Sequence, residues 1–232
     1  MISGSPYPFS SFNPVGEAKV IALAPLSQAD AVLTIAIVGL GPVGICAAVS
    51  LLDMLADLKK SKGLEHRVVA VDPLESRRDK MQRILSKINI KESTVMVTDI
   101  PSSKKIVDEW TGSIGCNAVL EVVGNNSALT LSYELVRPYG VISSVGVHQE
   151  PPLPFTGRDM YNKNVSFDFG RCPVRAMLPI ASRILLKRQD VFGGVGEEAS
   201  LIEKVVGLDD AAESYALFDK GKTGKVLFNP WL

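Results

Sequence analysis

Apolar runs alternate with helical patterns along most of the chain. Val32–Val38 is a mainly apolar run, which is typical of a strand that is buried on both faces of a sheet. In the following segment, Val43–Leu58, apolar residues recur every three or four positions, and this spacing indicates a helix. The alternation predicts further strands at Arg67–Val71, Thr94–Val97, Ala118–Val123, Tyr139–Val145 and Asn164–Phe169. It predicts further helices at Glu75–Lys87, Ser102–Trp110, Ser127–Val136 and Pro173–Lys187.

Six strands that alternate with helices predict an α/β fold of the Rossmann type, a doubly wound parallel sheet. Ser102 is the expected N-cap of its helix. A short extension follows the sheet, with strand, helix and strand predicted at Leu201–Val206, Leu208–Asp219 and Lys225–Phe228. We therefore divide the chain into a lead-in (residues 1–30), a sheet domain (31–198) and a C-terminal extension (199–232). The lead-in is rich in Ser, Pro and Gly, and Lys19–Leu23 within it could form one short strand.

The segment Gly39-Leu40-Gly41-Pro42-Val43-Gly44 joins the first predicted strand to the first helix. A G-x-G-x-x-G sequence in this position is the fingerprint of a dinucleotide-binding turn. Gly39 permits the tight turn, Gly41 lets the backbone approach a diphosphate, and Gly44 lets the helix pack close to the strand. The free N–H groups and the positive dipole end of the helix would bind the phosphates. Pro42 and Val43, in the first helical turn, are expected to lie against the cofactor.

The second predicted strand ends in Val71-Asp72. A carboxylate there can accept hydrogen bonds from both hydroxyls of the adenosine ribose, and it would repel a 2′-phosphate. NAD is therefore the expected cofactor and NADP is less favoured, although Arg77 could either lie along the adenine or assist NADP. Asp72 follows Gly44 by 28 positions, whereas the usual interval is ~20. The residues in excess of the usual interval fall in Asp53–His66, and they predict a longer helix end or a surface loop.

Composition and charge exclude several classes of partner and compartment. Lys+Arg and Asp+Glu number 25 each, so no basic excess is present to bind nucleic acid. The longest apolar run, Ala31–Val38, is shorter than the ~20 residues that span a bilayer, and the first residues lack the pattern of a secretory signal. These observations predict a cytoplasmic protein without membrane contact. The three cysteines and two histidines lack metal-ligand spacing, so neither a disulfide framework nor a zinc site is expected.

Six stretches of the chain carry a resemblance to a known family. They are AIVGLGPVGICA, RVVAVDPLESRRDKMQ, GCNAVLEVVGNNSAL, LVRPYGVISSVGVH, NVSFDFGRCPVR and LDDAAESYALFDKGKTGKVLFNP, in this order. They are distributed over the segment Ile35–Pro230, which spans most of the chain. This region resembles the C-terminal, NAD-binding part of the zinc-type medium-chain alcohol dehydrogenases.

The resemblance implies further contacts with the cofactor. Backbone around Val123-Gly124 and Val145-Gly146 would line the nicotinamide and its ribose. The segment that contains Phe169 would meet the carboxamide, and Lys225 would reach the diphosphate. Members of the family usually dimerise by pairing an edge strand of this domain, which implies a homodimer through Asn164–Phe169.

Two residues are candidates for catalysis. His148 follows the fifth predicted strand at the carboxyl edge of the sheet, where ligands bind in open α/β folds, and histidine suits acid–base chemistry near neutral pH. Cys172 precedes Pro173 at a helix start beside arginines, a setting that favours a reactive thiol. The alternatives are a loop histidine that lines the cofactor and a buried thiol in a capping turn. Weaker candidate acids near the same edge are Asp159, Tyr161 and Asp168.

This chain also differs from the family that it resembles, in the region before the first predicted strand of the sheet. Members of the family carry roughly 150 residues of catalytic domain there, enough for a domain of its own, and it holds the catalytic zinc. This chain has about 30 residues there, without Cys or His. Our first hypothesis is therefore a zinc-independent, NAD-dependent oxidoreductase for a small alcohol or carbonyl substrate. The alternatives are a cofactor-binding scaffold with redox-neutral or no catalysis and a fragment of a longer dehydrogenase. The extension, which would normally return to the catalytic domain, must either pack differently or leave an apolar face exposed for a hetero-partner.

Overall fold

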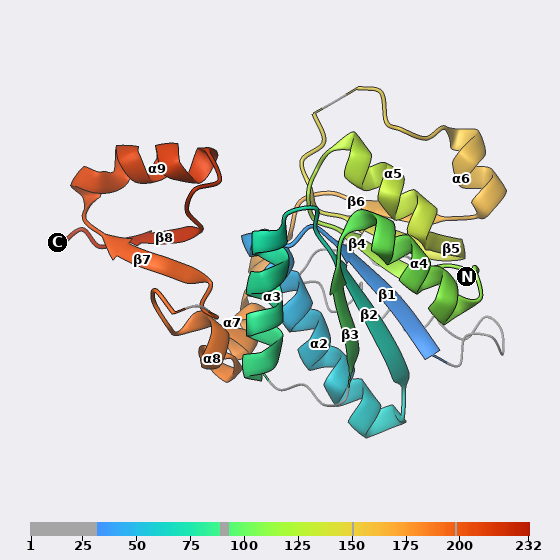
Figure 1. Ribbon diagram of the computed structural model, residues 1–232, viewed down its shortest axis with the longest axis horizontal. Coiled ribbons are helices and arrows are strands. Elements are labelled where there is room, and N and C mark those ends of the chain that lie inside the picture. The colour runs from blue at the N-terminus through green and yellow to red at the C-terminus, as the bar shows by residue number, and fades with distance from the viewer. Residues whose placement is uncertain (1–31, 89–92, 150, 198) are drawn as a thin grey trace.

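The computed structural model describes residues 32–88, 93–149, 151–197 and 199–232 (Figure 1). The strands of its main sheet are β1 (Val32–Val38), β2 (Glu65–Val71), β3 (Thr94–Thr98), β4 (Cys116–Glu121), β5 (Val136–Ser144) and β6 (Ser166–Phe169). The helices that follow these strands are α2 (Pro42–Lys62), α3 (Glu75–Ile88), α4 (Ile100–Thr111), α5 (Asn126–Leu135), α6 (Gly157–Lys163), α7 (Val174–Lys187) and α8 (Gln189–Phe192). The strand predicted within Lys19–Leu23 lies outside the described residues.

The main sheet is parallel throughout, and its strand order is β3-β2-β1-β4-β5-β6. The chain moves outward from β1 to β3 and then returns to the other side of β1. The point where the order reverses, between the carboxyl ends of β1 and β4, is where a crevice for ligands opens in such sheets. The sequence-based prediction of a six-stranded Rossmann-type fold is confirmed.

Both faces of the sheet are covered by helices, α2 and α3 on one side and α4 and α5 on the other (Figure 1). Alternate residues of β1 explain how it serves both cores, because successive side chains of a strand point to opposite faces. Leu33, Ile35 and Ile37 pack in the core with α2 and α3, whereas Ala36 and Val38 pack in the core with α4 and α5. This double burial accounts for the nearly continuous apolar composition of the strand.

The long interval between the glycine loop and Asp72 is occupied by helix. α2 continues to Lys62 and ends at Gly63, whose φ of 65° is the left-handed conformation common at helix C-termini. β2 then begins at Glu65. The surplus residues are therefore an additional length of α2, which is the first of the two possibilities that the sequence allowed.

Two predicted boundaries are wrong. The N-cap of α4 is Asp99 rather than Ser102, because the Asp99 carboxylate accepts a hydrogen bond from the backbone N–H of Ser102 at 2.8 Å and the helix starts at Ile100. β5 begins at Val136, directly after α5, rather than at Tyr139. The Arg137-Pro138 pair lies within this strand and does not separate it from the helix. A register shift against β4 and the positive φ of Tyr139, 59°, accommodate it.

A helix that the sequence analysis did not predict, α6, lies between β5 and β6. Thr156 and Asp159 form a capping box at its start: the Asp159 carboxylate accepts from Thr156 N at 2.7 Å, and the Thr156 hydroxyl accepts from Asp159 N at 3.3 Å. A threonine followed three residues later by an acid is the sequence signal of this motif. The segment after His148 is therefore partly helical.

The C-terminal extension forms a separate two-stranded parallel sheet of β7 (Ile202–Val206) and β8 (Lys225–Phe228). A 3-10 turn at Leu208–Asp210 and helix α9 (Ala211–Asp219) connect the two strands. The extension projects from one side of the main sheet, near α3 and α8 (Figure 1). None of the described helices combines the length and the hydropathy that crossing a bilayer requires.

His66 of β2 makes the stability of the fold depend on pH. Its Nε2 lies 2.5 Å from Ser93 Oγ, and burial lowers the pKa of the imidazole. The pKa of His66 is therefore lower in the folded protein than in the unfolded chain, where it is about 6.5. Between these two pKa values the unfolded chain binds a proton that the folded protein does not, so the free energy of unfolding should decrease as pH falls through this range. We expect the urea midpoint to fall between pH 8 and pH 5.5, and less so in His66→Gln. Equal pH dependence in the two proteins would contradict this.

Candidate functional site

The glycine loop adopts the tight turn that its sequence predicts. Gly39 has a φ of 99°, and its N–H donates to Val71 O at 2.8 Å, which binds the loop to β2. A Cβ on Gly44 would lie 1.9 Å from Gly39 O, so no side chain fits there. A Cβ on Gly41 would meet no atom within 4 Å. Gly44 is therefore required by the loop itself, and the space beside Gly41 is open for a ligand.

The start of α2 is arranged to receive an anion. Gly41 is its N-cap, so no side chain caps the helix, and Pro42 occupies the first turn without an acidic residue beside it. Backbone N–H groups that have no intrahelical acceptor remain at such an end, and the helix dipole makes it electropositive. The open space at Gly41 and this uncapped end fit a diphosphate.

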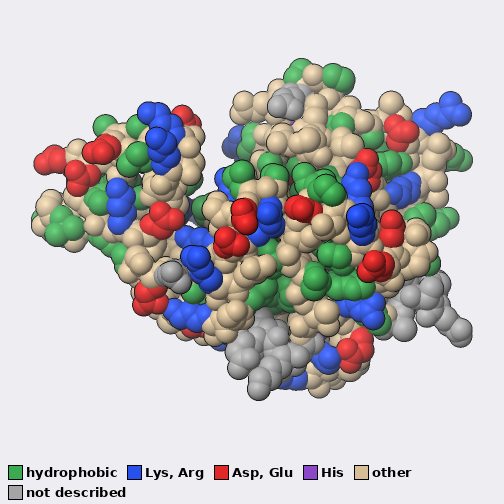
Figure 2. Space-filling view, viewed as in Figure 1, with side chains coloured by type: hydrophobic (Ala, Val, Ile, Leu, Met, Phe, Trp, Pro, Cys, Tyr) green, Lys and Arg blue, Asp and Glu red, His purple; other side chains and the backbone are tan. Residues whose placement is uncertain are grey.

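A cleft of about 530 Å³ lies between the glycine loop and the C-terminal extension (Figure 2). Gly41 and Pro42 form one side, and the segment from Lys220 to Lys225 forms the opposite side. Arg77 and Lys80 of α3 contribute further cations. Lys225 lines the same cleft as Gly41 and Pro42 at the start of α2. Burial raises the pKa of the nearby Cys46 thiol to about 11, and the Lys225 cation acts in the opposite direction. The cleft thus combines the uncapped helix end with several positive side chains.

Asp72 directly follows β2, beside the glycine loop, and is 1% exposed. One carboxylate oxygen accepts from Leu40 N at 2.8 Å and the other accepts from Leu74 N at 2.9 Å. An Arg77 Nη1 lies 3.5 Å from the carboxylate. Asp72 therefore also fixes the glycine loop against β2. A carboxylate oxygen has two lone pairs, so the oxygen that accepts from Leu40 N and Arg77 is fully used, and the oxygen that accepts from Leu74 N can take one more hydrogen bond.

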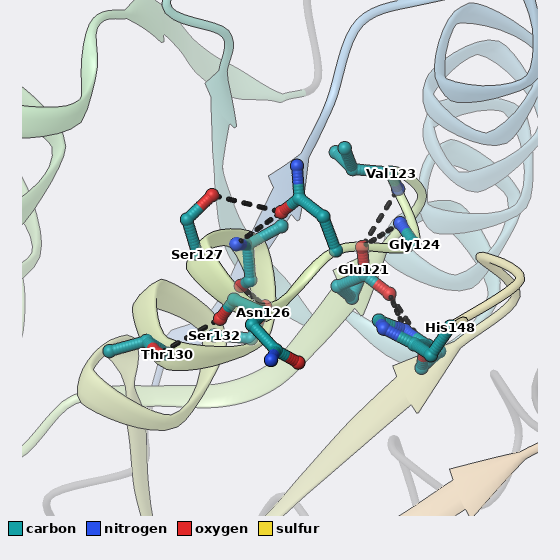
Figure 3. Close-up of polar contacts among 11 residues, drawn as sticks. Glu121, Val123, Gly124, Asn126, Ser127, Thr130, Ser132 and His148 are labelled. Carbon is teal, nitrogen blue, oxygen red and sulfur yellow. Dashed lines mark hydrogen bonds and ion pairs between the residues drawn. The ribbon is translucent and has the colours of Figure 1, made fainter. Parts of the chain in front are cut away.

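A second buried carboxylate, Glu121 at the end of β4, lies on the other side of the glycine loop and is 0% exposed. One of its oxygens accepts hydrogen bonds from Val123 N at 2.8 Å and Gly124 N at 2.7 Å (Figure 3). The other accepts from Ser144 Oγ at 2.6 Å and contacts His148 Nε2 at 2.9 Å. Glu121 thereby connects the end of β4 to the end of β5 and to the loop after it.

The loops that follow β4 and β5 are in direct backbone contact. A Cβ on Gly146 would lie 2.2 Å from Gly124 N, and a Cβ on Gly124 would lie 2.7 Å from Val147 N. A Cβ on Gly39 would lie 2.6 Å from the Val123 side chain. The glycine loop and these two loops therefore form one closely packed group at the carboxyl edge of the sheet. Val123, Gly124, Val145 and Gly146 belong to this group of loops, and their contact with the nicotinamide stays a prediction.

A second cleft, of about 600 Å³, adjoins this group. It is lined by His148, Gln149, Pro151, Pro152, Leu153, Phe167 and Phe169. The rings of His148 and Phe169 are 5.2 Å apart, and the His148 side chain is 3% exposed. The structure thus brings together two of the predicted residues, His148 and Phe169, in a mainly apolar cleft.

The remaining candidate acids and the candidate thiol are placed differently. Cys172 is half-buried and is not among the residues that line the two clefts. The hydroxyl of Thr156 donates to the Asp159 carboxylate and lowers its pKa, so Asp159 serves as a helix cap. Tyr161 of α6 is exposed, and Asp168 lies within β6.

Glu121 and Ser144 are site residues that the sequence analysis missed. The sequence analysis placed Glu121 inside a strand that it extended to Val123, whereas β4 ends at Glu121 and so puts this acid in the same kind of position as Asp72. The signal that could have found it is a single acid in an otherwise apolar strand. No comparable signal marked Ser144, since a serine in a buried strand has no preferred role. Its contact with Glu121 follows from the register of β4 and β5, in which the two residues are opposite each other.

The fold, the glycine loop and the uncapped helix are those of a Rossmann-type domain of the dinucleotide-binding class. The profile of the zinc-binding dehydrogenase family matches residues 42–172. The chain belongs to this family, and it corresponds to the family's C-terminal, NAD(P)-binding part.

Individual relatives agree with this assignment. The chain is 38% identical over 195 residues to "Zinc-type alcohol dehydrogenase B" of Aspergillus flavus, which is 84% of this chain and 41% of the relative. It is 34% identical over 131 residues to "Medium chain reductase/dehydrogenase ucsI" of Acremonium sp, 55% of this chain and 38% of the relative. The chain thus spans about two fifths of the length of these relatives. An alcohol dehydrogenase of Aeropyrum pernix has the same fold, with a TM-score of 0.68 and 22% identity, over 95% of this chain and 55% of that one.

The family name refers to zinc. Among the described residues, no group of three or more His, Cys, Asp or Glu side chains could hold a metal ion.

Proposed function

We propose that the protein binds NAD(H) along the carboxyl edge of the main sheet and acts as an oxidoreductase on a small alcohol or carbonyl substrate. The observation that carries the proposal is the cleft between the uncapped start of α2 and the lysines of the extension. The helix end and Lys225 would bind the diphosphate, and Asp72 would bind the adenosine ribose. When bound, the nicotinamide would supply hydride transfer, while the protein positions substrate and cofactor.

Calorimetry with NADH tests this proposal, and ADP-ribose, which lacks the nicotinamide, separates the two halves of the site. We expect both compounds to bind, and NADH to bind more tightly. A change in nicotinamide absorbance with an alcohol, aldehyde or ketone would then establish turnover. Absence of binding by both compounds at millimolar concentration, with folded protein, would refute the proposal.

The preference for NAD over NADP rests on the Asp72 carboxylate. Asp72→Asn removes a negative charge and one acceptor oxygen, so NADH binding should weaken at least tenfold, the effect of losing about one charged hydrogen bond. NADPH binding should strengthen, since a 2′-phosphate would no longer be repelled. Asp79→Asn, which makes the same charge change on the exposed side of α3, is the matched control and should alter neither affinity. Calorimetry in one buffer gives all the affinities, and an unchanged preference in Asp72→Asn would contradict the assignment.

Two assembly proposals follow from the surfaces. β6 is an edge of the main sheet, and we propose it as the contact of a homodimer.

The extension exposes Tyr215, Phe218, Leu227 and Trp231. An exposed apolar set of this kind fits a protein partner or a further domain. Measurement of the molecular mass in solution, with and without residues 199–232, tests both contacts.

A further inference from the structure

The buried Glu121 carboxylate determines which nitrogen of His148 carries hydrogen. Glu121 Oε2 accepts the hydrogen of the Ser144 hydroxyl at 2.6 Å, and His148 Nε2 lies 2.9 Å from both of these oxygens. A carboxylate oxygen can only accept, and the one hydrogen of Ser144 is already donated to it. Nε2 must therefore be the donor, and the hydrogen of the imidazole is on Nε2.

The other ring nitrogen, Nδ1, is an acceptor without a partner. In the part of the chain that the structure describes, it is buried and makes no hydrogen bond. A hydrogen on Nδ1 would leave a buried N–H unpaired, which is rarer in proteins than an unpaired acceptor. The His148 ring lines the cleft of about 600 Å³ together with Phe167 and Phe169. His148 Nδ1 is therefore an acceptor, in a ring that lines this cleft, with which the hydrogen-bond donor of a ligand can pair.

The fold indicates which part of a dinucleotide reaches this cleft. Asp72, on the β2 side of the glycine loop, faces the adenosine half, and a dinucleotide crosses the sheet at the point where the strand order reverses. The nicotinamide half therefore lies toward β4 and β5, where His148 stands. A flat aromatic ring suits the apolar lining of Phe167, Phe169 and Leu153. The N–H donor of that ring system is its carboxamide.

We infer that His148 Nδ1 accepts a hydrogen bond from the nicotinamide carboxamide, and that Glu121 is the positioning residue that keeps Nδ1 free of hydrogen. The inference rests on the proposed binding of NAD(H). It assigns His148 to cofactor recognition and not to proton transfer with the substrate. Glu121 has a second effect through its other oxygen, because Val123 N and Gly124 N are held in the same group of loops.

The tautomer can be measured without any cofactor. The chain has two histidines, so the ¹⁵N spectrum of its imidazoles is simple, and His148→Gln assigns the signals. We expect His148 to show a protonated Nε2 and an unprotonated Nδ1 at pH 7.5. A hydrogen on Nδ1 in the wild-type protein, whether in the other tautomer or in the imidazolium ion, would overturn the inference even if NADH binds well.

Glu121→Gln is expected to reverse this tautomer. The amide oxygen of the new side chain must face Val123 N and Gly124 N, since only an oxygen can accept from them. The amide NH₂ then faces His148 and donates to Nε2, so the imidazole hydrogen moves to Nδ1. The same spectrum shows whether this happens. An unchanged tautomer in folded Glu121→Gln protein would contradict the role of Glu121.

Binding measurements connect the tautomer to the carboxamide. The 3-acetylpyridine analogue of NAD⁺ replaces the carboxamide NH₂ by a methyl group and so lacks the N–H donor. We expect the wild-type protein to bind NAD⁺ about tenfold more tightly than the analogue, the effect of one hydrogen bond. In Glu121→Gln and in His148→Phe the ratio should fall to about one. ADP-ribose should bind all three proteins equally, which shows that the adenosine half and the fold remain intact.

The outcomes are distinguishable from failure of the proposed function. If neither NAD⁺ nor ADP-ribose binds, the proposed function fails, whatever the tautomer. If both bind but the wild-type protein does not discriminate between NAD⁺ and the analogue, the contact with the carboxamide is wrong. If His148→Phe keeps the tenfold ratio and loses only turnover, His148 is an acid–base residue and the inference is overturned.

Discussion

Gly44→Ala is expected to destabilise the protein by about 3 kcal/mol or more, at the upper end for overpacked sites, and to abolish measurable NADH binding. A Cβ there would lie 1.9 Å from Gly39 O and 2.8 Å from Gly39 C, and both are backbone atoms that cannot rotate away. To relieve the clash, α2 must separate from the end of β1. The loop would then lose the shape that presents the helix N-terminus to a diphosphate.

Gly41→Ala is the matched control within the same loop. Gly41 has a φ of −67°, which alanine adopts without strain, and its Cβ would meet no protein atom within 4 Å. Its unfolding free energy should therefore stay within about 0.5 kcal/mol of the wild type. NADH binding should nevertheless weaken at least tenfold, because the methyl group would occupy space that the diphosphate needs. Urea unfolding and calorimetry separate the two effects. Normal NADH affinity in Gly41→Ala would show that the diphosphate does not approach this residue.

The second large effect is expected from Gly146→Ala, which acts on the loops after β4 and β5. The added Cβ would lie 2.2 Å from Gly124 N and 2.3 Å from Gly124 Cα. Separation of these loops would disturb Val123 N and Gly124 N, which donate to the buried Glu121 carboxylate. Overpacking together with weakened hydrogen bonds to a buried charge should destabilise the fold by about 3 kcal/mol or more.

Gly157→Ala is the control variant for Gly146→Ala. Gly157 begins α6, and a Cβ there would meet nothing within 4 Å, so the substitution should leave stability unchanged or raise it slightly. Thermal unfolding of both variants, followed by circular dichroism, measures the difference. A Gly146→Ala variant as stable as Gly157→Ala would mean that the two loops are not packed as the structure shows.

Much of the fold could be predicted because local patterns and tertiary packing agree in this chain. β1 was predicted with its observed bounds, since a strand buried on both faces must be apolar at nearly every position. The glycine loop was equally clear, because its glycines have separate steric functions, of which the contact of Gly44 with Gly39 is visible in the structure.

The errors arose where tertiary contacts decide the local structure. Arg137-Pro138 is typical of a break between elements, yet this pair lies in β5, since pairing with β4 begins already at Val136. Asp99 rather than Ser102 caps α4, because both residue types are suited to capping and only the path of the chain after β3 selects the one three positions earlier.

The sequence by itself determined the architecture and the adenosine half of the proposed site, since hydrophobic periodicity, the glycine spacing and an acid at the end of the second strand are local properties. Tertiary structure alone decided the hydrogen bonds on the nicotinamide side. Glu121 ends β4, whereas Ser144 ends β5 and His148 follows it, and they meet only because β4 and β5 are adjacent and in one register. Hydrogen bonds between distant residues depend on that register, which no local pattern encodes.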